Sequence, residues 1–562
     1  MSNKVVIVGL DGGAFSTLQP WMDAGHLPNL QRMMQTGVSG DLQSVIPPVT
    51  APAWVSFMTG KNPGKHGVYY FTTRDKTTGR EVPVSASSRT GKTLWELLSD
   101  SGKTVLVLNV PTTYPPTPVN GVLIADFLTP KGKRDFVYPN ELLDEIESRF
   151  GPYPLYLKTP VFAANLSESN VESFLAELYQ ELRYKMAVMD YLMERYAPDF
   201  SMVHLWGTDR AQHELWNLFD ANHPRYNAKL AARCQPKIIQ YFSAVDAALG
   251  QLQQRLDEDT TLIVMSDHGF GPIHRFIDLN VWLLQHGFIA IKPTLVSQLR
   301  LWAWKLGITN ELFLKLLLGL VKLGIRLPDR TPADAVNLVR EDGFQPLLSL
   351  NDVDWSKTKA YAKFGLGQIV INLAGRDAKG SVQPGEEYRQ VRDEIIERLK
   401  TLRDPDTGQL IGGEIYTKED AYHGEFLDQA PDITFLPLEN NYMANILVGF
   451  STRRWIMDIP ALFGNHRLNG IFIAQGQHLA KGRRLHGARI IDIAPTVLYL
   501  MGQKIPTDMD GAVLTEAFTD EFLNHQAIEW TEPSQSLATT APSLTQDDEA
   551  TIIERLKGLG YL

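Results

Sequence analysis

Short runs of apolar and β-branched residues recur along the chain, each long enough for one strand of a sheet. They cover Lys4 to Leu10, Thr104 to Asn109, Phe200 to Leu205 and Thr261 to Met265. Continuous apolar runs of this kind are typical of parallel strands that are buried on both faces. We therefore predict a mostly parallel central sheet.

Helical patterns lie between these strands, for example at Thr93 to Leu98 and Val171 to Arg195. Strands that alternate with helices predict an α/β fold in which helices flank both faces of the sheet. In such folds, ligands bind beyond the carboxyl ends of the strands. Asp11, Asp209 and Asp267 each follow a predicted strand, so one edge of the sheet is expected to collect them.

The alternation stops at residues 291–354, which we predict to be a helical cap insertion. Within it, Pro293 to Leu327 has the pattern of one or two amphipathic helices, with Trp302 and Trp304 among its apolar residues. The simpler interpretation is that these helices pack on the core. The alternative is peripheral contact with a membrane or lipid, because Arg and Lys residues accompany the apolar face.

Strand-like patterning then returns at Lys359 to Leu373, Ile433 to Leu436 and Gly470 to Ala474, with a late helix at Ile490 to Leu500. We predict that residues 1–290 and 355–515 form one core. Residues 516–562 are predicted to be a flexible linker and a C-terminal helix, because Thr531 to Gln546 is rich in Ser, Thr, Pro and Gln.

Composition narrows the classes of function. The formal net charge of -10 over 562 residues argues against nucleic acid as a partner, since phosphate backbones are held mainly by clustered Lys and Arg. The single cysteine, Cys234, excludes an internal disulfide framework and is expected to be a small buried or half-buried thiol. The start of the chain lacks the pattern of a signal peptide, and no apolar run reaches the ~20 residues of a spanning helix, so we predict a cytoplasmic protein.

Two glycine patterns imitate nucleotide-binding loops. Gly9, Gly12 and Gly13 follow the first strand, but their spacing is not that of a dinucleotide fingerprint. Gly91-Lys92-Thr93 resembles the end of a P-loop, yet Ala86 stands where its first glycine should be. Neither pattern predicts a nucleotide cofactor.

Two acid and histidine pairs are candidate metal ligands. Asp209 and His213 are four residues apart, so on a helix both side chains leave the same face and can reach one ion, although an exposed histidine one turn after an acid would give the same pattern. Asp267 and His268 follow a buried strand, where an ionised carboxylate is costly unless a cation offsets it.

Asp11 has the same placement as Asp267, although alone it could merely cap a turn. His466 is needed as well, because Asp209 and His213 supply only two of the three protein ligands usual at an open catalytic zinc.

Thr50 precedes Pro52, a residue suited to the first turn of a helix, so Thr50 should lie at a helix start. An isolated threonine there would simply cap the helix. Next to a metal ion, however, its hydroxyl ionises more readily and can attack phosphorus, and the helix start favours a phosphate. Together with the acids and histidines above, Thr50 predicts a two-metal phosphoryl-transfer site.

The chain resembles the alkaline phosphatase superfamily, and within it the type I phosphodiesterase/nucleotide pyrophosphatase group and its predicted bacterial phosphohydrolase or phosphomutase relatives. The resemblance lies in residues 5–12 (VVIVGLDG), 59–67 (TGKNPGKHG), 266–269 (SDHG) and 492–496 (DIAPT). It implies an alkaline-phosphatase-like sandwich with a mostly parallel sheet.

The resemblance also implies a site and a mechanism. Asp11, Thr50, Asp267 and His268 would surround one divalent metal, and Asp209, His213 and His466 would hold the other. The ions would be zinc or manganese, and the imidazole-rich ligand set favours zinc. Thr50 would form a covalent phosphothreonine intermediate that water then hydrolyses.

Two departures bear on the substrate. The sequence lacks the C/S-x-P-x-R stretch of sulfatases at Thr50, which disfavours sulfate esters. It also lacks an Asn shortly after His66-Gly67, where nucleotide pyrophosphatases of this group bind the substrate phosphate. We therefore expect a small-molecule, lipid or glycan phosphate ester. A phosphomutase and a non-catalytic metal-containing binder of lipid or glycan remain the alternatives.

Overall fold

The computed structural model describes residues 3–74, 80–157, 166–310, 312, 347–363, 365–445, 450–458, 462–534 and 544–561. The chain divides into two compact units. Unit 1 contains Met1–Ile273, Tyr422–Ala430 and Pro460–Leu562, and unit 2 contains His274–Ala421 and Pro431–Ile459. Unit 2 thus extends on both sides of residues 291–354, the segment that the sequence set apart.

Unit 1 is built on a nine-stranded sheet with the strand order β20-β2-β19-β9-β1-β8-β5-β6-β7. In this order its strands are Arg483–Arg489, Val38–Gln43, Asn469–Gln475, Thr260–Met265, Lys4–Leu10, Phe200–Leu205, Val105–Leu108, Gly121–Ile124 and Val137–Tyr138. The strands from β9 to β6 are parallel to one another, while β19 and β7 run antiparallel to their neighbours. The predicted parallel centre of the sheet is confirmed.

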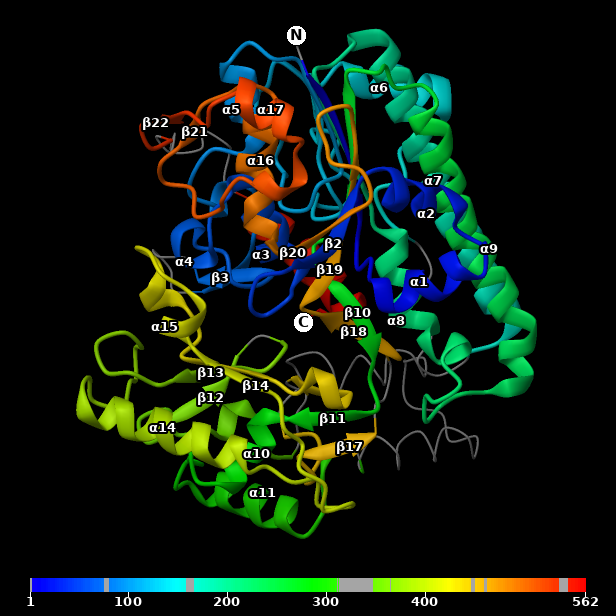
Figure 1. Ribbon diagram of the computed structural model, residues 1–562. Coiled ribbons are helices and arrows are strands. Elements are labelled where there is room, and N and C mark those ends of the chain that lie inside the picture. The colour runs from blue at the N-terminus through cyan, green and yellow to red at the C-terminus, as the bar shows by residue number, and fades with distance from the viewer. Residues whose placement is uncertain are drawn as a thin grey trace. The chain divides into compact units, whose positions relative to one another are not determined.

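Helices cover both faces of this sheet (Figure 1). One face carries α1 (Phe15–Asp23), α2 (Pro28–Thr36), α6 (Leu142–Phe150), α7 (Glu168–Tyr196), α8 (Gly207–Phe219) and α9 (Ala228–Gln253). The other face carries α3 (Thr50–Thr59), α5 (Leu94–Asp100), α16 (Ile493–Leu500) and α17 (Asp520–His525). The predicted α/β fold, with a mostly parallel sheet flanked by helices, is therefore confirmed.

Shorter elements complete unit 1. They are α4 (Pro63–His66), α18 (Gln546–Gly558) and the strand pairs β3–β4 (Thr72–Arg74, Glu81–Pro83), β10–β18 (Gly269–Pro272, Gly464–Arg467) and β21–β22 (Ile505–Pro506, Trp530–Thr531). Part of the predicted linker, residues 535–543, lies outside the described residues.

Unit 2 has its own apolar core between two small sheets and three helices. One sheet has the order β12-β13-β15-β14 (Ala360–Ala362, Gln368–Ile371, Ile433–Leu436, Glu414–Thr417) and the other β16-β11-β17 (Tyr442–Asn445, Arg275–Asp278, Ile456–Asp458). The helices are α10 (Leu279–Gln285), α11 (Leu295–Lys305) and α14 (Glu386–Lys400), with the short α15 (Lys418–Ala421) after β14. Helix α11 forms part of the predicted amphipathic segment, but residues 311 and 313–346 lie outside the described part of the chain.

Among the described helices, none combines the length and the apolar character needed to cross a bilayer.

Candidate active site

The register of the central strands brings the carboxyl ends of β9, β1 and β8 together. Leu10 of β1 pairs with Leu205 of β8, and Gly9 pairs with Met265 of β9. Asp11 is therefore the first residue beyond β1, Asp267 lies just beyond β9, and the helix that follows β8 carries Asp209. The topology thus places three carboxylates at one edge of the sheet, as the sequence predicted.

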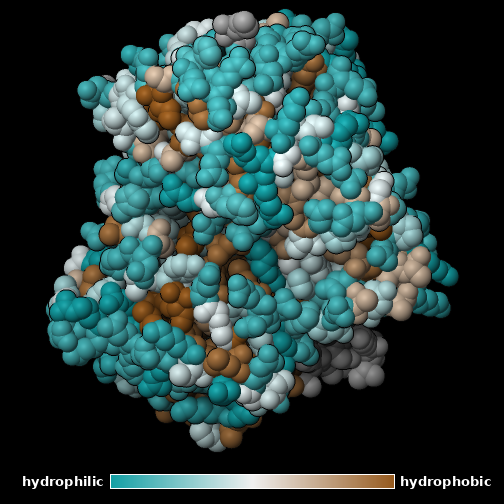
Figure 2. All heavy atoms as spheres, in the orientation of Figure 1, coloured by the Kyte–Doolittle hydropathy of each residue, from teal (hydrophilic) through white to brown (hydrophobic). Residues whose placement is uncertain are grey.

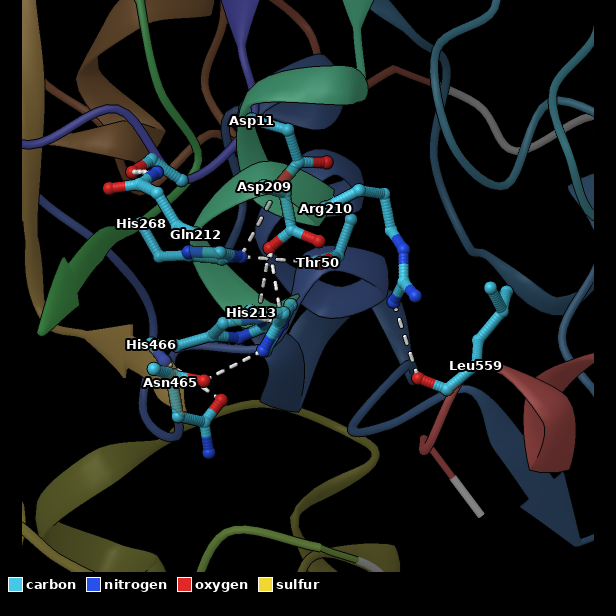
Figure 3. A network of polar contacts seen from close by, with 12 residues as sticks. Asp11, Thr50, Asp209, Arg210, Gln212, His213, His268, Asn465, His466 and Leu559 are labelled. Atoms are coloured by element: carbon cyan, nitrogen blue, oxygen red, sulfur yellow. Dashed lines mark hydrogen bonds and ion pairs between the residues drawn. The ribbon is translucent and has the colours of Figure 1, made fainter. Parts of the chain in front are cut away.

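Other elements supply the remaining candidate residues. Helix α8 carries Asp209 and His213 on one face, strand β18 carries His466, and Thr50 is the first residue of α3. All of them are buried, each with at most 2% of its surface exposed. Figure 3 shows the acidic and histidine side chains turned toward one another beside Thr50.

Asp209, His213 and His466 form one compact group. Asp209 Oδ1 lies 3.3 Å from His213 Nε2 and 3.2 Å from His466 Nε2, and the two Nε2 atoms are 3.0 Å apart. A tetrahedral zinc with bonds of about 2.0–2.1 Å holds neighbouring ligand atoms roughly 3.3 Å apart. The three side chains therefore have the spacing of zinc ligands.

The hydrogen bonds of the two imidazole rings also favour metal binding. His213 Nδ1 lies 2.9 Å from the carbonyl of Gly464, and His466 Nδ1 lies 2.8 Å from the carbonyl of Pro48. A carbonyl only accepts, so each Nδ1 donates, and a ring with a single proton then presents the lone pair of Nε2. Two lone pairs 3.0 Å apart repel each other unless a cation lies between them.

His268 is set up in the same manner beside Asp11, Asp267 and Thr50. Its Nδ1 lies 3.1 Å from the carbonyl of Gly269, which leaves Nε2 as an acceptor. That Nε2 lies 3.2 Å from Thr50 Oγ1, 3.5 Å from Asp11 Oδ1 and 3.2 Å from Asp267 Oδ2. The ligand atoms of Asp11, Asp209 and His268 also lie within 4.8 Å of one another, so Asp209 is shared between two groups that could each hold a metal ion.

The buried carboxylates are suited to bind a cation. Among the described residues, Asp11 Oδ1, Asp209 Oδ1 and Asp267 Oδ2 have no hydrogen-bond partner. Burial raises the pKa of Asp11 and of Asp267 well above the usual range of aspartic acid, and the neighbouring carboxylates raise it further. Burial also lowers the pKa of His268 and His466, which favours neutral imidazoles that can bind a metal. The donor set therefore fits divalent ions.

Three cations of unit 1 that could neutralise a dianionic phosphate each pair with a carboxylate. Lys61 pairs with Asp508, and Arg89 with Glu96 at 2.9 Å. Arg210 forms a buried pair with Glu214 at 2.6 Å.

His204 belongs to the site but was missed by the sequence analysis. Its Nε2 lies 2.7 Å from Asp11 Oδ2, and it projects from the buried strand β8. The only signal in the sequence was a histidine inside an apolar strand, where a polar side chain needs a buried partner. Tyr561 was missed as well: its hydroxyl lies 3.2 Å from Asp209 Oδ2.

Comparisons with known proteins bear on this site. The model of the family described as type I phosphodiesterase / nucleotide pyrophosphatase matches residues 5–445. The chain belongs to this family. The resemblance seen in the sequence, to this group within the alkaline phosphatase superfamily, is thereby confirmed, and the family is one of phosphoesterases. A comparison with curated proteins gave no match.

Two solved structures are similar to this chain at low sequence identity. Phosphonoacetate hydrolase from Sinorhizobium meliloti, in complex with phosphonoacetate, is 15% identical with a TM-score of 0.50, over 89% of this chain and 95% of that one. Human ectonucleotide pyrophosphatase / phosphodiesterase 5 is 15% identical with a TM-score of 0.45, over 91% of this chain and 97% of that one.

Proposed function

We propose that the protein is a two-metal phosphohydrolase that cleaves a phosphodiester or related phosphate ester through a covalent phosphothreonine on Thr50. The observation that carries this proposal is the pair of buried acid and histidine groups on either side of Asp209, with the Thr50 hydroxyl 3.2 Å from His268. Membership of a phosphoesterase family supports a catalytic role for such a site.

Six acidic and histidine side chains would hold the ions, with Thr50 beside them. Asp209, His213 and His466 would bind one ion; Asp11, Asp267 and His268 would bind the other. Mixed nitrogen and oxygen ligands suit zinc, and manganese is the alternative. When bound, the ions supply positive charge that favours ionisation of the hydroxyl and stabilises the charge that builds on the phosphate oxygens.

Thr50 is proposed to act as the nucleophile. It begins α3, where backbone N–H groups and the helix dipole favour a phosphate. In the first half of the reaction, a bond forms between Thr50 Oγ1 and phosphorus while the bond from phosphorus to the leaving oxygen breaks; the hydroxyl proton balances the one that the leaving alcohol takes up. In the second half, water attacks phosphorus, the bond to Thr50 breaks, and the threonine regains a proton.

The charges favour a diester over a monoester. Two divalent ions against three carboxylates leave one net positive charge, which matches a monoanionic diester. A dianionic monoester would favour an additional Arg or Lys. Lys61, Arg89 and Arg210 are paired with Asp508, Glu96 and Glu214 instead.

Substitution of Thr50 tests the proposal. Thr50→Ala should lower the turnover of an aryl phosphodiester by more than about 1000-fold while two equivalents of metal stay bound. Thr50→Ser should retain part of the activity. Thr59→Ala is the matched control, because Thr59 is buried in the same helix and its hydroxyl donates only to the Val55 carbonyl. Mass spectrometry of the quenched reaction should find the phosphoryl group on the peptide that contains Thr50.

The products separate the competing functions. Release of the alcohol from a diester supports hydrolysis, whereas a rearranged monoester would identify a phosphomutase. Stoichiometric metal binding without turnover of any ester would leave only a binding protein. Unchanged turnover in Thr50→Ala would contradict the assignment of the nucleophile.

We also propose peripheral membrane contact through α11. Leu295, Leu299, Trp302 and Leu306 are spaced along one helix face and are 77%, 55%, 61% and 60% exposed. Figure 2 shows hydrophobic residues at the surface around the place where Figure 1 draws α11. Trp302→Ser should weaken binding to anionic vesicles, while Trp530→Ser, at a tryptophan that is 50% exposed in unit 1, should not. Equal vesicle binding by Trp302→Ser and the wild type would exclude this contact.

A further inference from the structure

Helix α18 and the residues after it are docked onto unit 1 beside the candidate site. The Arg555 guanidinium donates to the carbonyls of Phe127 and Thr129 and stacks on the Tyr156 ring at 3.8 Å. Arg210, the neighbour of Asp209 on α8, donates to the carbonyl of Leu559 at 3.4 Å (Figure 3). These contacts fix the backbone that leads to Tyr561.

Tyr561 inserts its side chain between the site and an aromatic wall. Its ring centroid lies 4.4 Å from that of Phe71, and only 8% of the residue is exposed. The Tyr70 hydroxyl donates to the Tyr561 carbonyl at 2.7 Å, which fixes the residue from the backbone side. The Tyr561 hydroxyl then donates to Asp209 Oδ2 at 3.2 Å.

The three buried carboxylates share one pattern. Asp11 Oδ2 is held by His204 at 2.7 Å, and Asp267 Oδ1 accepts from the Gly12 amide at 3.2 Å. In both, the second oxygen has no hydrogen-bond partner among the described residues and faces His268. Asp209 follows the same rule, since Oδ2 accepts from Tyr561 while Oδ1 faces the two histidines.

We propose that Tyr561 is a positioning residue of the active site: it holds Asp209 Oδ2 and thereby turns Oδ1 toward the ion bound with His213 and His466. This inference rests on the proposed two-metal function. A donor behind a metal-binding carboxylate fixes its orientation, and loss of such a donor typically costs about 10- to 100-fold in metal affinity. Residues 546–561 thus contribute to the metal site through Tyr561.

The alternative is that Tyr561 only fills space or blocks the site. If Tyr561 only fills space, a substitution that preserves its ring would leave metal affinity unchanged. A blocking residue would raise activity when its hydrogen bond is removed, again with unchanged metal affinity. The affinity of the Asp209 site therefore separates positioning from both alternatives, independently of turnover.

The test is Tyr561→Phe in the full chain, which keeps the ring against Phe71 and removes the hydroxyl. Chelator competition against zinc should find one of the two ions bound about 10- to 100-fold more weakly, and the other unchanged. Tyr184→Phe is the matched control, because its hydroxyl donates to the Gly151 carbonyl at 2.6 Å, away from the site. Hydrogen exchange should show α18 as protected in the variant as in the wild type.

The affected ion is identified in a second background. His466→Ala removes a ligand of the Asp209 site, so adding Tyr561→Phe should leave the affinity of the remaining ion unchanged. A further loss there, or wild-type affinities for both ions in the single Tyr561→Phe variant, would overturn the positioning role alone. A wild-type protein that binds no divalent ion would instead overturn the proposed function on which the inference rests.

Discussion

Replacement of His204 by phenylalanine should weaken only the ion held by Asp11, Asp267 and His268. The histidine is buried in β8, and its Nε2 lies 2.7 Å from Asp11 Oδ2. Phenylalanine keeps an aromatic ring next to Trp54, whose ring centroid lies 5.1 Å from that of His204, but it offers no N–H to the carboxylate.

The magnitude follows from the short contact. A hydrogen bond to a charged group contributes about 1.5–3 kcal/mol, and each 1.4 kcal/mol corresponds to about tenfold in a binding constant. Loss of the donor frees Asp11 to rotate, so we expect zinc affinity at this site to fall about 10- to 100-fold. The ion held by Asp209, His213 and His466 should keep its affinity.

Chelator competition with both metals resolved is the assay. His223→Phe is the control, because His223 is also buried in unit 1 and its Nε2 lies 3.0 Å from the Ile273 carbonyl rather than a carboxylate. If His204→Phe binds both ions as tightly as the wild type, the donors behind the carboxylates do not set metal affinity. That result would exclude an orienting role of His204 for Asp11 and would count against the same role of Tyr561 for Asp209.

Two further predictions concern packing and pH. Gly9→Ala would place its Cβ 2.6 Å from the ring of the fully buried Trp54, which lies in the helix that begins with Thr50. The substitution should cost about 1–3 kcal/mol in the free energy of unfolding, measured by urea denaturation. It should also lower kcat in steady-state kinetics, because it displaces that helix. Burial raises the pKa of Asp278 to about 7, so folded protein binds more protons than unfolded chain, and stability is lost as pH rises from about 4 to about 7. Asp278→Asn keeps the cap of α10. The variant should therefore be more stable than the wild type at pH 8, by on the order of 4 kcal/mol at most, and equally stable at pH 4. Hydrogen exchange in α10 would detect this difference. Equal protection of α10 in both proteins at pH 8 would contradict this.

The central sheet could be predicted because its strands are buried on both faces. Lys4–Leu10 and Phe200–Leu205 form strands at the predicted residues, since a parallel strand between two helical layers must be apolar along its whole length. Two strands at one side of the sheet were missed: Val38–Gln43 and, outside it, the edge strand Arg483–Arg489. Both contain exposed polar residues, among them Asp41, Gln43, Arg483 and Arg484, so they lack the continuous apolar run.

Most of the candidate ligands could be found because they have a local signal. Asp11 and Asp267 end buried strands, and Asp209 and His213 have the spacing of one helix face. His466 has no such signal, because it reaches the site through the short β10–β18 pair, in which it lies opposite Phe270. Its placement depends on tertiary structure, and the sequence indicated it through the need for a third ligand and through the family resemblance.

The residues behind the ligands could not be found, and the reason is physical. A metal ligand must be an acid, histidine or similar group, which restricts the choice in the sequence, whereas the partner that orients it need only be a donor at the right distance. For the three carboxylates this partner is an imidazole, a phenol and a backbone amide in turn. The phenol comes from Tyr561, which is 352 residues away from Asp209 along the chain, so only the docking of α18 onto the rest of unit 1 brings the two together.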